Sequence, residues 1–140
     1  MMNLHVVAMK QVGAFKGDGP WDDDLKDIET VYLRSSGEFL VGLVDGKIVA
    51  MGAFRPTGEH EAEIKRMRVH PEWQGHGFGQ IILSALESHA TSMGYRRLHL
   101  ETSIIQVAAQ ALYRRNGFRE IGRAVIDGFD CILFEKILGE

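Results

Sequence analysis

The chain has 140 residues, 45% of them apolar and 25% charged, with 16 Lys and Arg against 19 Asp and Glu. Such a length and composition predict one soluble domain over residues 1–140. The net charge of −3 and the lack of a long apolar run argue against nucleic-acid binding and a membrane span. Cys131 is alone, which excludes an internal disulfide, and with no signal-peptide pattern we expect a cytoplasmic location.

The first third of the chain predicts a helix followed by a hairpin. In "WDDDLKDIETVYLRS", apolar residues recur near helical spacing and acidic residues lead, as helix N-termini favour. Two apolar runs then flank Asp45 and Gly46, a dipeptide that is the strongest short-range hairpin signal. Strands at 38–44 and 47–54 are therefore expected.

A polar loop, "RPTGEHE", precedes the next predicted strand at 62–69, "AEIKRMRV". Its imperfect alternation predicts a β-bulge near 67–69, a feature common beside active sites. A helix follows from residue 80, with Gly94 as its C-cap. Its predicted apolar face consists of Ile81, Ile82, Ala85, Leu86, Ala90 and Met93.

The last third predicts a strand at 95–102, a helix at about 106–116 and a closing hairpin of 118–125 and 129–137. The order is helix, β, β, β, helix, β, helix, β, β. A strand, helix, strand unit over 61–102 should make a right-handed parallel crossover within an otherwise antiparallel sheet. We expect a ligand cleft where that parallel pair ends.

The glycine-rich stretch "GHGFG" at 75–79 is either a tight surface turn or a phosphate-binding loop at a helix N-terminus. A Walker loop is excluded because Gln80 and Ile81 stand where Lys and Ser or Thr are needed. The spacing G-x-G-x-G also differs from the Rossmann fingerprint. The loop has no acidic residue to hold a magnesium ion, which favours a diphosphate bound without metal.

Gln74, Gly77 and Gly79 resemble the Q/R-x-x-G-x-G/A signature of the GNAT superfamily of acetyl-CoA-dependent N-acetyltransferases. "LETSIIQVAAQALYRRNGF" is similar to the second signature of the family, with matching residues at Ala109, Leu112, Tyr113, Gly117 and Phe118. The similarity covers roughly 38–137 and is to small bacterial-type single-domain members. It implies an α/β fold built on a mixed sheet, of the α+β type. The sheet would be mostly antiparallel with one central parallel crossover, and helices would lie on both of its faces.

The sequence departs from the family pattern in two places. Gln106 stands where an Asn is common. The first 35 residues are also short for the first strand and the two helices that usually shape the acceptor pocket. The acceptor is therefore the part of the function that the resemblance describes least.

The resemblance implies transfer of an acetyl group from acetyl-CoA to a primary amine of a small molecule by direct attack. An aliphatic amine is mostly protonated at neutral pH, so a general base is needed. Glu63 occupies the position of the family's base, although it could instead pair with Lys65, Arg66 or a cation of another strand. Glu101 is the second candidate, as base or as a group that recognises the amine, and Glu61 is the third.

The resemblance also assigns residues to the donor. Tyr113 would protonate the departing thiolate, and backbone donors near Val69 would polarise the thioester carbonyl. The pantetheine arm would pair with the backbone from Met67 to Val69, and Gln106 would bond its amide. The remaining predicted cofactor-binding residues are Gln74, Gly75, His76, Gly77, Phe78, Gly79 and Gln80. Of these, the backbone N–H groups of Gly75, His76, Gly77, Gly79 and Gln80 would hold the pyrophosphate.

Two other functions remain open: a protein lysine or N-terminal acetyltransferase, and a catalytically silent acyl-CoA sensor. No metal is expected, because the spacing of His70 and His76 fits no ligand motif. A homodimer is open as well, because family members often pair through sheet edges. The apolar final strand "CILFEKIL" could present such an edge.

Overall fold

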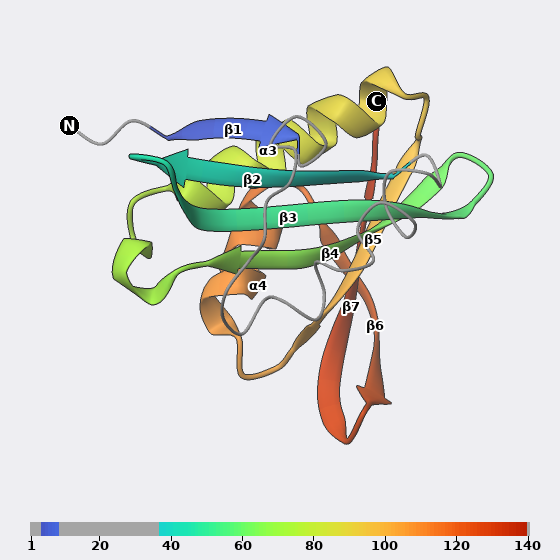
Figure 1. The fold of residues 1–140 in the computed structure, drawn as a ribbon. Coiled ribbons are helices and arrows are strands. Elements are labelled where there is room, and N and C mark those ends of the chain that lie inside the picture. Colours follow the sequence, from blue (N-terminus) through green and yellow to red (C-terminus); the bar gives the residue numbers. More distant parts are fainter. Residues whose placement is uncertain (1–3, 9–36, 140) are drawn as a thin grey trace.

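A computed structural model describes residues 4–8 and 37–139. These residues form a seven-stranded sheet in the order β1-β2-β3-β4-β5-β7-β6 (Figure 1). Within it only the β4–β5 pair is parallel. The strands are β1 (His5–Ala8), β2 (Glu38–Val44), β3 (Lys47–Gly58), β4 (Glu61–Val69), β5 (Arg97–Ser103), β6 (Arg119–Ile126) and β7 (Phe129–Ile137), and the helices are α3 (Phe78–Ser92) and α4 (Val107–Arg115).

Helices α3 and α4 lie on the same face of the sheet (Figure 1). Along α3, Ile82, Leu83 and Leu86 are fully buried in the main core. On α4, the Tyr113 ring lies 6.1 Å from the ring of Phe134, a β7 residue of the same core. The predicted mixed sheet with one parallel crossover is confirmed. The helix expected at 21–35 lies outside the described residues.

Both predicted hairpin turns are present. Asp45 and Gly46 have φ of 52° and 78°, and Asp127 and Gly128 have φ of 51° and 82°. Two positive φ values in a two-residue turn match the right-handed twist of the strands, and Asp and Gly tolerate them. The sequence of each turn therefore sets the register of its hairpin.

Several predicted boundaries and faces were wrong. The stretch expected as a polar loop is mostly strand, because β3 continues to Gly58 and only a short turn follows. Ile81 of α3 and its C-cap residue Met93 are 43% and 45% exposed, whereas Leu83 is fully buried. The sequence reading also missed β1, which pairs with β2 at the sheet edge. Within the described residues, no helix is long and apolar enough to cross a membrane.

Candidate active site

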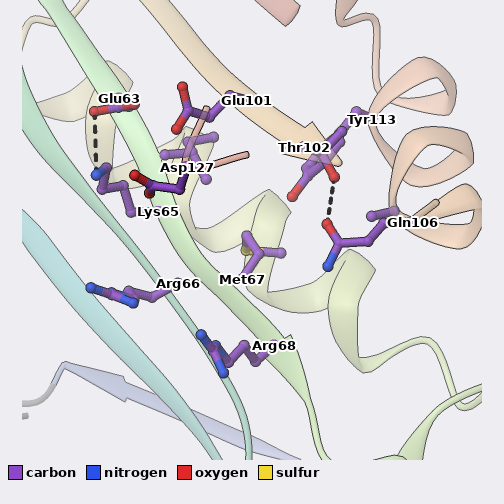
Figure 2. Close-up of a pocket in the computed structure, with 12 residues that line it drawn as sticks. Glu63, Lys65, Arg66, Met67, Arg68, Glu101, Thr102, Gln106, Tyr113 and Asp127 are labelled. Atoms are coloured by element: carbon purple, nitrogen blue, oxygen red, sulfur yellow. Dashed lines mark hydrogen bonds and ion pairs between the residues drawn. The ribbon is translucent and has the colours of Figure 1, made fainter. Parts of the chain in front are cut away.

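A cleft opens in the sheet where β4 and β5 stop pairing. Their parallel register covers only residues 61–63 and 97–99. A cavity of about 540 Å³ lies beyond that point (Figure 2), where the sequence predicted a cleft. Its lining comes from β4, β5, α4 with its N-cap, and the β6–β7 turn. The described lining residues are Glu63, Ile64, Lys65, Arg66, Met67, Arg68, Glu101, Thr102, Gln106, Ala109, Tyr113 and Asp127.

A β-bulge in β4 shapes one wall of the cavity. Gly52 of β3 faces two residues of β4, Arg66 and Met67, and Arg66 has a φ of 60°. The bulge thus begins one residue before the predicted interval of 67–69. A Cβ atom on Gly52 would lie 2.6 Å from Met67 Sδ and from Ile82 Cγ2, so the site opposite the bulge has room only for glycine.

The β4 wall presents different chemistry on the two faces of the sheet. Ile64 is buried in the core beneath α3, and Met67 packs against that core. Because side chains alternate along a strand, the next residues, Lys65 and Arg68, point to the opposite face. The cavity therefore has an apolar side toward the helices and a charged side on the opposite face of the sheet.

Glu63, the predicted general base, is held by cations through one of its oxygens. Arg55 Nε and Nη2 donate to Glu63 Oε1 at 3.3 and 3.1 Å, and Lys65 Nζ lies 3.9 Å from the same oxygen. The Glu63 side chain is 12% exposed. The ion pairing considered as an alternative role is thus present. Its other oxygen, Oε2, has no hydrogen bond to another described residue.

Glu101 and Asp127 supply the other carboxylates of the cavity. Neither side chain has a hydrogen bond or ion pair with any other residue in 4–8 or 37–139, and both residues are exposed. Asp127 was not predicted as a site residue, because its position depends on which strand of the sheet pairs with the closing hairpin. By contrast Glu61, the third candidate base, is outside the lining and pairs with Arg97 at 2.8 Å.

Tyr113 closes the apolar side of the cavity. It is 5% exposed, and its ring packs edge-on against Phe118 at a centroid distance of 5.8 Å. Burial raises the pKa of Tyr113 to about 12, because the low-dielectric surroundings disfavour the phenolate. At neutral pH the side chain is therefore a neutral phenol, the form that can donate a proton.

Gln106 lies at the N-cap of α4, beside the cavity. Its Oε1 accepts a 2.7 Å hydrogen bond from Thr102 Oγ1, marked in Figure 2. Since this acceptor is used, a hydrogen bond from Gln106 to a ligand would come from Nε2. The predicted contact to a pantetheine amide is compatible with this arrangement.

The glycine loop forms the entrance to α3. Gly75 and Gly77 both have a φ of 82°, and Gly77 is the N-cap residue without a side-chain cap. The first helical hydrogen bond runs from Ile81 N to Gly77 O, so the N–H groups of the first turn face the helix end. Gln74 Nε2 donates to Val69 O at 3.1 Å, which ties the loop to the end of β4.

Gln80 joins α3 to α4, a role that the sequence reading missed. Its Nε2 donates to Asn116 Oδ1 at 2.7 Å, and Asn116 Nδ2 donates back to Gln80 Oε1 at 2.8 Å. Asn116 also donates to Leu112 O at 2.8 Å. The two helix ends beside the cleft are therefore linked by paired amides.

Aromatic rings pack around the same loop. The centroids of Trp73 and Phe78 lie 5.9 Å apart in a stacked arrangement, and His76 lies 6.0 Å from Phe78. Phe78 is buried at 5% exposure and belongs to the core. Among the described residues, no group of three or more His, Cys, Asp or Glu is placed to hold a metal ion.

The structure thus brings together only part of the predicted site. The cavity lining includes Glu63, Met67, Glu101, Gln106 and Tyr113. The other predicted residues are outside it, at the end of β4 and in the loop: Val69, Gln74, Gly75, His76, Gly77, Phe78, Gly79 and Gln80.

Residues 6–118 match the family model described as Acetyltransferase (GNAT) family. The N-acetylaspartate synthetase of Homo sapiens is 31% identical over 119 residues, which are 81% of this chain and 39% of that protein. The chain spans less than two thirds of the length of the curated relatives it matches.

Solved structures share the fold. A GNAT-family acetyltransferase from Staphylococcus aureus Mu50 has a TM-score of 0.81 at 21% identity, over 98% of this chain and 100% of that chain. A GNAT-family acetyltransferase from Elizabethkingia anophelis with acetyl-CoA bound has a TM-score of 0.74 at 21% identity, over 97% and 99% of the two chains.

Proposed function

Because the chain belongs to the Acetyltransferase (GNAT) family and its domain is of the acyltransferase class, we propose that it transfers an acetyl group from acetyl-CoA to a primary amine of a small molecule. The observation that carries this proposal is the cavity between β4 and β5, which has Tyr113 on one side and carboxylates on the other. A cavity of about 540 Å³ suits part of a cofactor arm and a small acceptor.

The donor would bind along the helix side of the cleft. The uncapped N-terminus of α3 and the left-handed Gly75 and Gly77 suit a pyrophosphate. The arm would follow β4 past the bulge, where β5 no longer pairs with that strand. Gln106 Nε2 then supports the arm from α4.

Glu63 would act as the general base through Oε2. Arg55 holds Oε1, which fixes the carboxylate in one orientation and leaves the second oxygen to accept a proton from the attacking amine, directly or through a water. Glu101 across the cleft is the competing candidate, because it lines the same cavity without a partner among the described residues.

Tyr113 would donate a proton to the thiolate as it leaves. Its buried position, with a pKa of about 12, keeps the phenol protonated throughout the neutral range. Met67, Ala109 and the Tyr113 ring contribute apolar surface to the lining of the cavity. A hydrogen bond to a developing thiolate is stronger in such surroundings.

The proposed function is tested by measuring enzymatic turnover. Release of free thiol from acetyl-CoA would be followed with a panel of small primary amines, and the acetylated product identified by mass spectrometry. Amine-dependent release supports the proposal. Acetylation confined to lysine or N-terminal amines of peptides would replace it with the protein-acetyltransferase function. Acetyl-CoA binding without any turnover would instead support the function of a catalytically silent acyl-CoA sensor.

A further inference from the structure

The charges of the cavity are divided between its walls, except that Glu63 of β4 also lines it and is paired with Arg55 and Lys65. Among the described lining residues, three cations, Lys65, Arg66 and Arg68, all come from β4. The carboxylates of Glu101 and Asp127 come from β5 and the β6–β7 turn, on the other side of the cleft. Figure 2 shows Glu101 and Asp127 toward one end of the cavity and Arg68 farther along β4. A ligand between the walls therefore meets both signs of charge.

The two sets of charges do not neutralise each other. Arg68 is exposed and makes no hydrogen bond or ion pair with any other described residue, and the same holds for Glu101 and Asp127. When a ligand displaces water from the cavity, each of these groups loses hydration, and this loss is costly unless an opposite charge replaces the water. A neutral or purely cationic ligand would leave Arg68 uncompensated.

Arg68 is poorly placed to bind the phosphates of acetyl-CoA. The proposed pyrophosphate site is the N-terminus of α3, on the helix face of the sheet. Arg68 is paired in register with Met51, and both residues belong to the opposite face, away from the core beneath α3. The guanidinium is thus directed to the charged side of the cavity, where the acceptor would approach.

We propose that the acceptor is an amine that also carries an anionic group, a carboxylate or a phosphate. Arg68 binds the anion. Glu101 and Asp127 bind the ammonium before Glu63 removes its proton. This inference rests on the proposed function and adds the class of its acceptor. A guanidinium suits the task because its planar donors match two oxygens of a carboxylate or phosphate.

The experiment compares matched pairs of acceptors. Each pair contains an amine with an anionic group and the same amine without it: amino acids against their decarboxylated amines, and phosphoethanolamine against ethanolamine. The wild type is measured beside Arg68→Met, the charge-preserving Arg68→Lys, and Arg123→Met as a matched control. Arg123 lies outside the described lining, on β6, and pairs with Glu120. Thermal unfolding checks that each variant is folded.

We expect kcat/KM to be at least about 10-fold higher for the anionic member of the preferred pair. Arg68→Met should remove most of this preference through the KM of the acceptor, consistent with the loss of a charged hydrogen bond. Arg68→Lys should restore part of it, and Arg123→Met should leave it unchanged. The amino-acid pairs test a carboxylate and the phosphoethanolamine pair tests a phosphate, so a comparison of the two identifies which anion is bound.

Three results would overturn the inference. In the first, the uncharged member of each pair reacts equally well or better. In the second, Arg68→Met raises the KM for acetyl-CoA and leaves that of the acceptor unchanged. In the third, no anionic amine reacts although acetyl-CoA binds. Failure to bind acetyl-CoA at all would instead refute the proposed function, so the two failures are distinguishable.

Discussion

The side chains of Gln80 and Asn116 form two reciprocal hydrogen bonds, of 2.7 and 2.8 Å, between the first turn of α3 and the C-cap of α4. Replacing either residue by Ala leaves the amide oxygen of the other, half-buried residue without its donor, which typically costs about 1 to 3 kcal/mol. We therefore expect each single variant to lower the free energy of unfolding by that amount.

A double-mutant cycle checks this link. Because Gln80→Ala and Asn116→Ala remove the same interaction, the double variant should be less destabilised than the sum, with a coupling of at least about 0.5 kcal/mol by urea unfolding. Additive effects would show that the paired amides contribute nothing as a unit.

The glycines of the loop should differ in their tolerance of alanine. Gly77 has a φ of 82°, so Gly77→Ala should destabilise the protein by roughly 1 kcal/mol. Gly79 lies inside α3, and a Cβ there would be 3.5 Å from Leu112 Cδ2, an ordinary contact. Gly79→Ala should therefore be neutral or stabilising by up to about 1 kcal/mol.

The Gly79→Ala variant also tests the donor site. A methyl group on Gly79 would stand beside the proposed pyrophosphate, so Gly79→Ala should weaken acetyl-CoA binding while the protein stays folded. Thermal unfolding and calorimetric titration measure the two effects separately. Unchanged acetyl-CoA affinity in a folded Gly79→Ala variant would argue against close approach of the phosphates.

Tyr113→Phe should lower kcat by about 100-fold and change the KM for acetyl-CoA little, because the ring packing remains and only the proton donor is lost. Tyr95→Phe, a matched change outside the described lining, should leave kcat unchanged. Full activity of Tyr113→Phe would exclude the phenol as the acid.

The pKa of Tyr113 also predicts a stability change at alkaline pH. The unfolded phenol ionises near 10.0 and the folded one at about 12, so ionisation favours the unfolded chain between these values. The free energy of unfolding should fall as the pH rises from 10 to 12. Since Phe cannot ionise, Tyr113→Phe should reduce this fall in urea-unfolding measurements.

Glu63→Gln should lower kcat most at low pH, where the acceptor amine is protonated and the base is needed. At high pH the amine is already free, and the variant should approach the wild type. The pH profile of kcat, measured also for Glu101→Gln, checks the assignment. If only Glu101→Gln shows this pH dependence, Glu101 is the base.

Local patterns predicted much of the fold. The turns at Asp45 and Asp127 were read from two-residue signals, and the family resemblance of the loop and of the stretch around Tyr113 is confirmed by the family model. These features depend on residues close together in the sequence. The short β1 was missed because its four residues form a strand only through pairing with β2.

Side-chain partners across the fold could not be predicted in the same way. Asp127 lines the cavity because β7 pairs with β5, which a single sequence does not reveal. The bond between Gln80 and Asn116 joins residues 36 positions apart. For Glu63 the residues suggested both a base and an ion pair, and only the register with Arg55 shows the pairing.

The most direct test of the account is a calorimetric titration of the full chain with acetyl-CoA in the presence of EDTA, with NADH and ATP as controls. We predict binding of one acetyl-CoA per chain and no comparable binding of either control. No binding of acetyl-CoA, or equal binding of all three compounds, would contradict the donor site and with it the proposed acetyl transfer.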